Sequence, residues 1–109
     1  MHISIRKYKL NSQDAKTRGE LARQINDVFV PQISKASGFV SYYALDTGTG
    51  TLATVSVFES QSAAEESNRR AADFVKNSLP ALTLGPPEIT EGEVIASQGS
   101  RGDVRRATT

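Results

Sequence analysis

The chain of 109 residues contains no cysteine and no tryptophan, and its only histidine is His2. Without cysteine, neither a disulfide framework nor a thiolate metal site is possible. A single histidine forms no cluster of metal ligands either, so we expect no metal site. We interpret His2 as a solvated residue at the start of the chain, because imidazole chemistry needs a fixed partner.

An excess of charge of one sign is also missing, since the formal net charge is +1. Such a balance creates no field that would attract nucleic acid or an anionic membrane. No run of eighteen apolar residues occurs, and residues 1–10 lack the apolar stretch of a signal peptide. We therefore expect a cytoplasmic protein that binds neither nucleic acid nor membrane.

What the chain does contain is a hairpin at residues 39–58 whose strands are apolar on both faces. A half-solvated strand would alternate apolar and polar side chains. Period-two alternation gives the first strand two apolar sets, one of Phe39, Tyr43 and Leu45 and one of Val40, Tyr42 and Ala44. The second strand also has two, one of Ala53, Val55 and Val57 and one of Leu52 and Phe58. Helices can cover one face of this hairpin, so something else must cover the other.

Before the hairpin, the sequence predicts a strand and then a helix. Residues 2–10 alternate as a strand, with Ile3 and Ile5 on one face and Tyr8 and Leu10 on the other. The helix starts at a cap on Ser12, with Asp14 in the first turn, or at a capping box of Thr17 and Glu20. Its buried stripe is Leu21, Ile25, Val28, Phe29 and Ile33, and Pro31 predicts a kink.

After the hairpin, which a glycine turn at 46–50 closes, a second helix begins at Ser60 or at a capping box of Ser62 and Glu65. Its inner stripe is Ala64, Ser67, Ala71, Phe74, Val75, Ser78 and Leu79. Three prolines at positions 80, 86 and 87 predict a loop. Residues 88–97 predict a last strand that Gly92 interrupts. We expect one domain at 1–97 and a disordered tail at 98–109.

The order β-α-β-β-α-β predicts an α+β, ferredoxin-like fold, with two helices on one face of a four-stranded antiparallel sheet. If the other face carries about five or six large apolar groups, leaving it exposed forfeits on the order of 10 kcal/mol. We therefore expect a homodimer that packs sheet to sheet. The alternatives are that the proline loop and tail cover this face, or that one strand has a different register.

Two segments of the sequence resemble a known protein family. Residues 36–43, with the sequence ASGFVSYY, and residues 55–60, VSVFES, followed by Ala63, Ala64 and Glu65, are similar to antibiotic biosynthesis monooxygenase-like proteins. The resemblance covers roughly residues 2–97. It implies a dimeric α+β barrel with a small-molecule pocket between the helices and sheet of each subunit. Members of this family include cofactor-free oxygenases that act on quinol-like or polyketide aromatics, haem-degrading enzymes and proteins without known activity. The resemblance therefore implies one of these three classes.

Haem degradation does not fit, because that branch of the family uses a histidine and a tryptophan. We expect no cofactor. The candidate catalytic residues are Arg6, Tyr8, Tyr42 and Tyr43, and the candidate ligand-binding residues are Ser67, Asn68 and Phe74. A tyrosine hydroxyl can exchange a proton with a phenolic substrate, and an arginine can stabilise the resulting anion. Alternatively, the tyrosines are core or interface residues and Arg6 lies at the surface.

Two functions fit this sequence. One is a cofactor-independent monooxygenase, and the other is a non-catalytic or regulatory dimer of the same fold that binds a small ligand. Tyr42 and Tyr43 are adjacent in a strand, so they point to opposite faces and at most one lines a given cavity. An RNA-recognition domain shares the order of elements, but residues 51–58 lack its basic and aromatic signature.

Overall fold

The computed structural model describes residues 1–12, 14–79 and 83–99. The strands are β1 (His2–Leu10), β2 (Phe39–Asp46), β3 (Thr51–Phe58) and β4 (Thr83–Glu93). The helices are α1 (Ala15–Gln24), α2 (Val30–Ile33) and α3 (Gln61–Ser78), and a π-helical turn, η1 (Ile25–Phe29), joins α1 to α2. The order of elements is the one that the sequence predicts.

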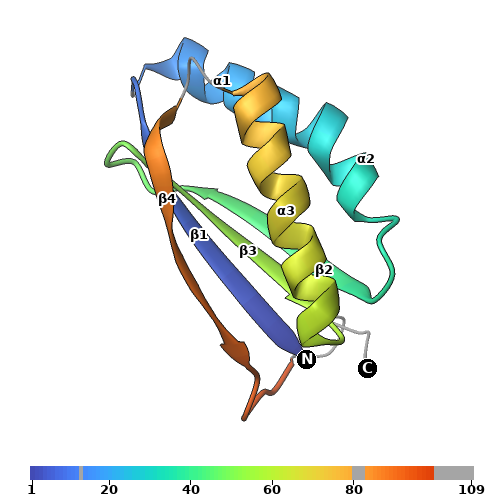
Figure 1. The fold of residues 1–109 in the computed structure, drawn as a ribbon. Coiled ribbons are helices and arrows are strands. Elements are labelled where there is room, and N and C mark those ends of the chain that lie inside the picture. The colour runs from blue at the N-terminus through green and yellow to red at the C-terminus, as the bar shows by residue number, and fades with distance from the viewer. Residues whose placement is uncertain (13, 80–82, 100–109) are drawn as a thin grey trace.

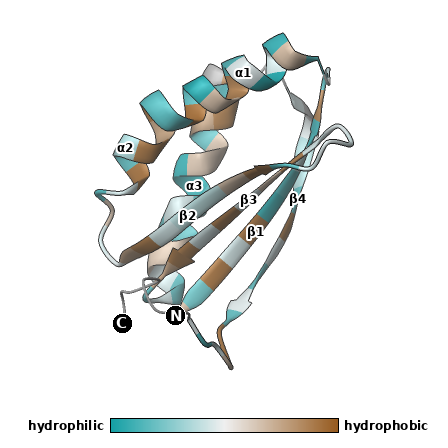
Figure 2. Ribbon diagram, turned by 180° about the vertical axis from the view of Figure 1, so that it is seen from behind, coloured by the Kyte–Doolittle hydropathy of each residue, from teal (hydrophilic) through white to brown (hydrophobic). Residues whose placement is uncertain are grey.

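The described strands form one antiparallel sheet in the order β2-β3-β1-β4. All helical elements lie on one face of this sheet (Figure 1). Seen from the opposite side, the sheet has no helix in front of it (Figure 2). The predicted α+β, ferredoxin-like fold is therefore confirmed, and we call the uncovered side of the sheet the open face.

The first helical region begins and bends for local reasons. Asp14 is the cap, because its side chain accepts a hydrogen bond from the Thr17 amide, so neither predicted start is right. Residues at a strict spacing of four drift around an α-helix of 3.6 residues per turn, and the wider turn η1 counteracts this drift. Pro31, which lacks an amide donor, follows directly in the first turn of α2.

The predicted helical stripes hold except at Val28. In the second stripe, the members Ala71 and Val75 are half-buried, and the side chain of Ser78 lies outside what the structure describes. Val28 is exposed and does not belong to the first stripe, whose buried members are Leu21, Ile25, Phe29 and Ile33. Ser60 caps α3, since its Oγ accepts a hydrogen bond from the Ala63 amide. The buried side chains of α3 are Ala64, Ser67 and Phe74, with Leu79 just beyond its end.

The predicted faces of β2 need one correction. The pairing of β2 with β3 shifts between Phe39 and Ser41, so an extra residue interrupts the alternation there. Phe39 consequently packs against the core beside Phe58, with ring centroids 5.8 Å apart, and does not share a face with Tyr43. Beyond the shift, the alternation holds as predicted.

The last strand differs from its prediction at both ends. It begins at Thr83, so Pro86 and Pro87 lie within β4 and not in a loop. An edge strand tolerates them, and the pairing with β1 is irregular at this point, between Lys7 and Lys9. Gly92 pairs with Ile3 without interrupting the strand, which ends at Glu93. The predicted tail, 98–109, lies outside the described residues from position 100 onward.

Candidate functional site

Polar side chains line the helix-covered face of the central strand β1. Alternation places His2, Ser4, Arg6 and Tyr8 on this face, and all four are buried. The expectation of a solvated His2 is wrong, because the ring is enclosed and neither ring nitrogen has a hydrogen-bond partner. The alternative that placed Arg6 at the surface is also wrong, since only 4% of this residue is exposed.

A hydrogen-bond network around Arg6 links three elements, namely its own strand β1, helix α3 and strand β4. Its Nε donates to the Tyr8 hydroxyl over 2.7 Å, and its Nη1 donates to Asn68 Oδ1 of α3 over 3.3 Å. The same amide oxygen accepts a hydrogen bond from Ser4 Oγ over 2.8 Å, and Asn68 Nδ2 donates to Glu91 Oε2 of β4 over 2.7 Å. Helix α3 is thereby linked to the sheet through a buried guanidinium.

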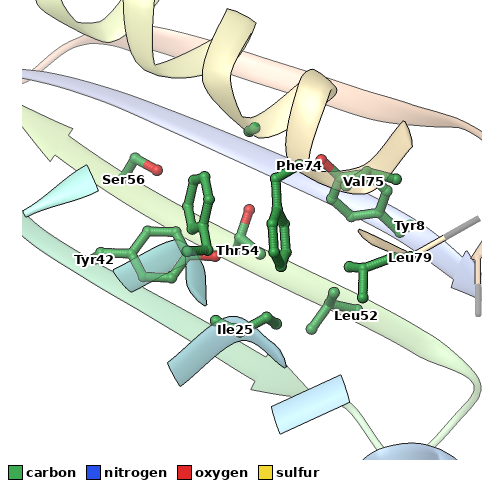
Figure 3. Close-up of a pocket in the computed structure, with 11 residues that line it drawn as sticks. Tyr8, Ile25, Tyr42, Leu52, Thr54, Ser56, Phe74, Val75 and Leu79 are labelled. Atoms are coloured by element: carbon green, nitrogen blue, oxygen red, sulfur yellow. The ribbon is translucent and has the colours of Figure 1, made fainter. Parts of the chain in front are cut away.

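A small cavity lies beside this network, between the helices and the sheet (Figure 3). Its volume is about 20 Å³, which is room for roughly one water molecule. The polar lining comes from Tyr8, Tyr42, Thr54 and Ser56. The apolar lining consists of Ile25, Phe29, Leu52, Ala71, Phe74, Val75 and Leu79. Thr54, which lines the cavity, pairs directly with Arg6 across the sheet. Arg6 therefore occupies the position of β1 next to the cavity.

The two adjacent tyrosines are separated by the sheet. Tyr42 lines the cavity and packs edge-on against Phe29, with ring centroids 5.3 Å apart. Burial, together with the nearby Tyr8, raises the pKa of Tyr42 well above its ordinary value, although a hydrogen bond with Thr54 and the charge of Arg6 act in the opposite direction. Tyr42 is therefore a neutral phenol at physiological pH. Tyr43 is 55% exposed on the open face and takes no part in the cavity.

The structure brings together most of the residues that the sequence singled out. Tyr8, Tyr42 and Phe74 line the cavity, while Arg6 and Asn68 form the adjoining network. Ser67 is a buried residue of α3 but does not line the cavity, and Tyr43 lies on the other side of the sheet.

Sequence reasoning missed four polar residues of this region, namely Ser4, Thr54, Ser56 and Glu91. Alternation could have identified Ser4, because it shares a face with Arg6, and both Thr54 and Ser56, because they share a face with Leu52. Glu91 had no such signal, since its place opposite Ser4 depends on the register between β1 and β4.

The described residues offer no cluster of three or more histidine, aspartate and glutamate side chains that could hold a metal ion. No helix among them is long and apolar enough to span a membrane.

Several solved structures of other proteins have a fold similar to that of this chain. A protein of unknown function from Nitrosomonas europaea is similar with a TM-score of 0.70 and 19% identity, over 93% of this chain and 95% of that one. The ActVA-Orf6 monooxygenase of Streptomyces coelicolor, solved with nanaomycin D, is similar with a TM-score of 0.64 and 20% identity, over 88% of this chain and 92% of that one.

A dimeric ferredoxin-like protein from an uncultured marine organism is similar with a TM-score of 0.67 and 10% identity, over 91% and 98% of the two chains. The chain has the fold of antibiotic biosynthesis monooxygenase-like proteins. At these identities the likeness concerns the fold alone. No family model matches the sequence, and no curated protein matches it.

Proposed function

We propose that the chain forms a homodimer through the open face of its sheet, and that each copy binds a small aromatic molecule between helices and sheet and oxygenates it without a cofactor. The buried pair of Arg6 and Tyr8 beside an aromatic-lined cavity carries this proposal. The fold supports it, since ActVA-Orf6, a monooxygenase, shares that fold.

Each polar group has a defined role in the proposed reaction. An anthrone loses a proton of its methylene carbon to solvent and becomes an enolate, and the Arg6 guanidinium stabilises the negative charge that develops. Tyr8 accepts a hydrogen bond from Arg6, so its own O–H remains available to donate to a ligand oxygen. Tyr42, held neutral by its surroundings, acts as a hydrogen-bonding group and not as a base.

The electrons for oxygen come from the substrate itself. The enolate carbon transfers them to dioxygen and forms a carbon–oxygen bond, which gives a peroxide. Loss of the O–O bond leaves one oxygen atom on the oxidised product as a carbonyl and releases the other as water, with both protons taken from the substrate. Atoms and electrons therefore balance without a metal or flavin.

The size of the cavity decides how a ligand could enter. Binding sites for small molecules usually measure about 300–1,000 Å³, whereas this one holds about 20 Å³. Phe74 is the side chain whose displacement would open it, because its ring projects from α3 into the cavity (Figure 3) and packs on Phe29 of η1 with centroids 5.0 Å apart. Phe74→Ala should lower the free energy of unfolding by about 3–5 kcal/mol and increase the affinity for aromatic probes.

The described residues that line the cavity include no carboxylate or histidine that could act as a base. This favours a second candidate, which is a dimer of the same fold that binds a ligand without turning it over. Oxygen uptake with a panel of quinols and anthrones distinguishes the two. A monooxygenase should consume oxygen in a way that Tyr8→Phe reduces and Tyr43→Phe, on the open face, does not. If no member of the panel supports uptake in the wild type or in Phe74→Ala, the catalytic proposal should be abandoned.

A further inference from the structure

Within the part of the chain that the structure describes, no carboxylate forms an ion pair with the buried Arg6. Ion pairs among the described residues involve Arg18, Arg23, Arg69 and Arg70 as arginine partners, but not Arg6. The hydrogen-bond acceptors of Arg6 are a phenol oxygen and an amide oxygen, which are both neutral. A buried charge without a counter-ion is costly, so such residues normally have one.

A counter-ion lies only one hydrogen bond further out. Asn68 stands between Arg6 and the exposed Glu91, accepting from the guanidinium with its oxygen and donating to the carboxylate with its nitrogen. This pair of contacts also fixes the orientation of the amide, because the opposite orientation would place NH₂ against the guanidinium. An aspartate has nearly the shape of an asparagine and at position 68 would neutralise Arg6 directly.

We propose that Asn68 keeps Arg6 uncompensated so that the guanidinium can bind an anion, and that the ligand of this site is an aromatic molecule that carries an acidic group, such as a carboxylate or an ionised enol. The ring would occupy the cavity and the acidic group would lie against Arg6, whose sheet partner Thr54 lines that cavity. Asn68 is a positioning residue in this scheme, whereas the exposed Glu91 does not hold the ligand. The inference rests on the proposed ligand site, but it does not require that the ligand be oxygenated.

A charge exchange tests this inference without altering the net charge. The double variant Asn68→Asp with Glu91→Gln moves one negative charge inward to Arg6. It also reverses the hydrogen bond between the two positions, because the amide of Gln would donate to the carboxylate of Asp where Asn68 now donates to Glu91. Glu91→Gln alone is the matched control. The probes are 2-naphthoate, which is an anion at neutral pH, and its uncharged methyl ester, titrated by fluorescence against the wild type and both variants.

The wild type should bind 2-naphthoate about tenfold or more tightly than the ester, because a charge-assisted hydrogen bond is lost in the ester. Glu91→Gln should keep this preference, and the double variant should lose it. Equal affinities in the wild type, or a preference that persists in the double variant, would overturn the proposal. Failure of both probes to bind the wild type and Phe74→Ala would overturn it as well.

Urea unfolding of the ligand-free proteins gives a second readout, which tests the premise that Arg6 lacks a counter-ion. Relief of the uncompensated charge should raise the unfolding midpoint of the double variant above those of the wild type and of Glu91→Gln. A midpoint at or below that of the wild type would refute the idea that Arg6 lacks a counter-ion. Neither readout depends on oxygen uptake, so a failure here is distinct from a failure of the catalytic proposal.

Discussion

The substitution Leu45→Lys tests whether the open face of the sheet forms the proposed dimer interface. Leu45 lies on the open face opposite Ala53 and is 51% exposed in the single chain. Burying a whole leucine contributes roughly 1.5–3 kcal/mol, so covering the exposed half contributes about 1 kcal/mol per copy. Two-fold symmetry doubles this to about 2 kcal/mol. The lysine would also bury an unpaired ammonium in each copy, at a further cost of at least about 1–3 kcal/mol each.

Together these terms predict that the variant dimerises roughly a thousandfold or more weakly than the wild type. Sedimentation at micromolar concentration measures this directly, since the monomer has a mass of 11.7 kDa. Thr49→Lys, in the exposed turn of the same hairpin, adds the same charge away from the open face and should leave the dimer intact. A wild type that sediments as a monomer, or a Leu45→Lys variant that remains dimeric, would refute the reasoning.

Two further predictions concern pH and backbone geometry. Because burial raises the pKa of Tyr42 above its ordinary 10.0, stability is fully present below pH 10 and declines above it, by about 1.4 kcal/mol at pH 11. Urea titrations at successive pH values should show a shallower decline for Tyr42→Phe, and an unchanged slope would contradict the burial argument. Gly38 and Gly48 both have φ of 78°, so alanine at either costs roughly 1–2 kcal/mol in strain. Only at Gly38 would the new Cβ meet Ala63, at 3.2 Å. Gly38→Ala should therefore have the lower urea midpoint, and equal midpoints would argue against that contact.

The sequence predicts the order of elements well because alternation and helical spacing are local signals. It fails where one residue changes the register. The extra residue after Phe39 reverses the face of that ring, and no local pattern marks it. Pro86 and Pro87 mislead for a related reason, since a proline excludes a central strand but not an edge strand, and the edge position of β4 is a property of the whole sheet.

The candidate site could be predicted only in part. Arg6, Tyr8 and Asn68 stand out by residue type, but their contact requires α3 to lie directly over β1, which depends on tertiary packing. The cavity volume depends on how the rings of Phe29 and Phe74 interlock, and side-chain packing of that kind leaves no trace in periodicity. Which face of the sheet Tyr42 occupies follows from alternation only when the pairing of β2 with β3 is known.

The first half of β1 is inverted relative to an ordinary sheet, and this links the proposed dimer to the proposed site. Its helix-covered face holds His2, Ser4 and Arg6, while Ile3 and Ile5 lie on the open face. In the second half the usual order returns, with Tyr8 and Leu10 in the core and Lys7 and Lys9 exposed. The burial of these polar side chains on the helix-covered face contributes little to the free energy of unfolding. The ring nitrogens of His2, which have no hydrogen-bond partner, lower this free energy further. In the proposed dimer, Ile3 and Ile5 become part of a second core, and their burial offsets the cost of the polar side chains on the helix-covered face. Loss of the dimer in Leu45→Lys should therefore also weaken anion binding at Arg6, although Leu45 lies across the sheet from that site.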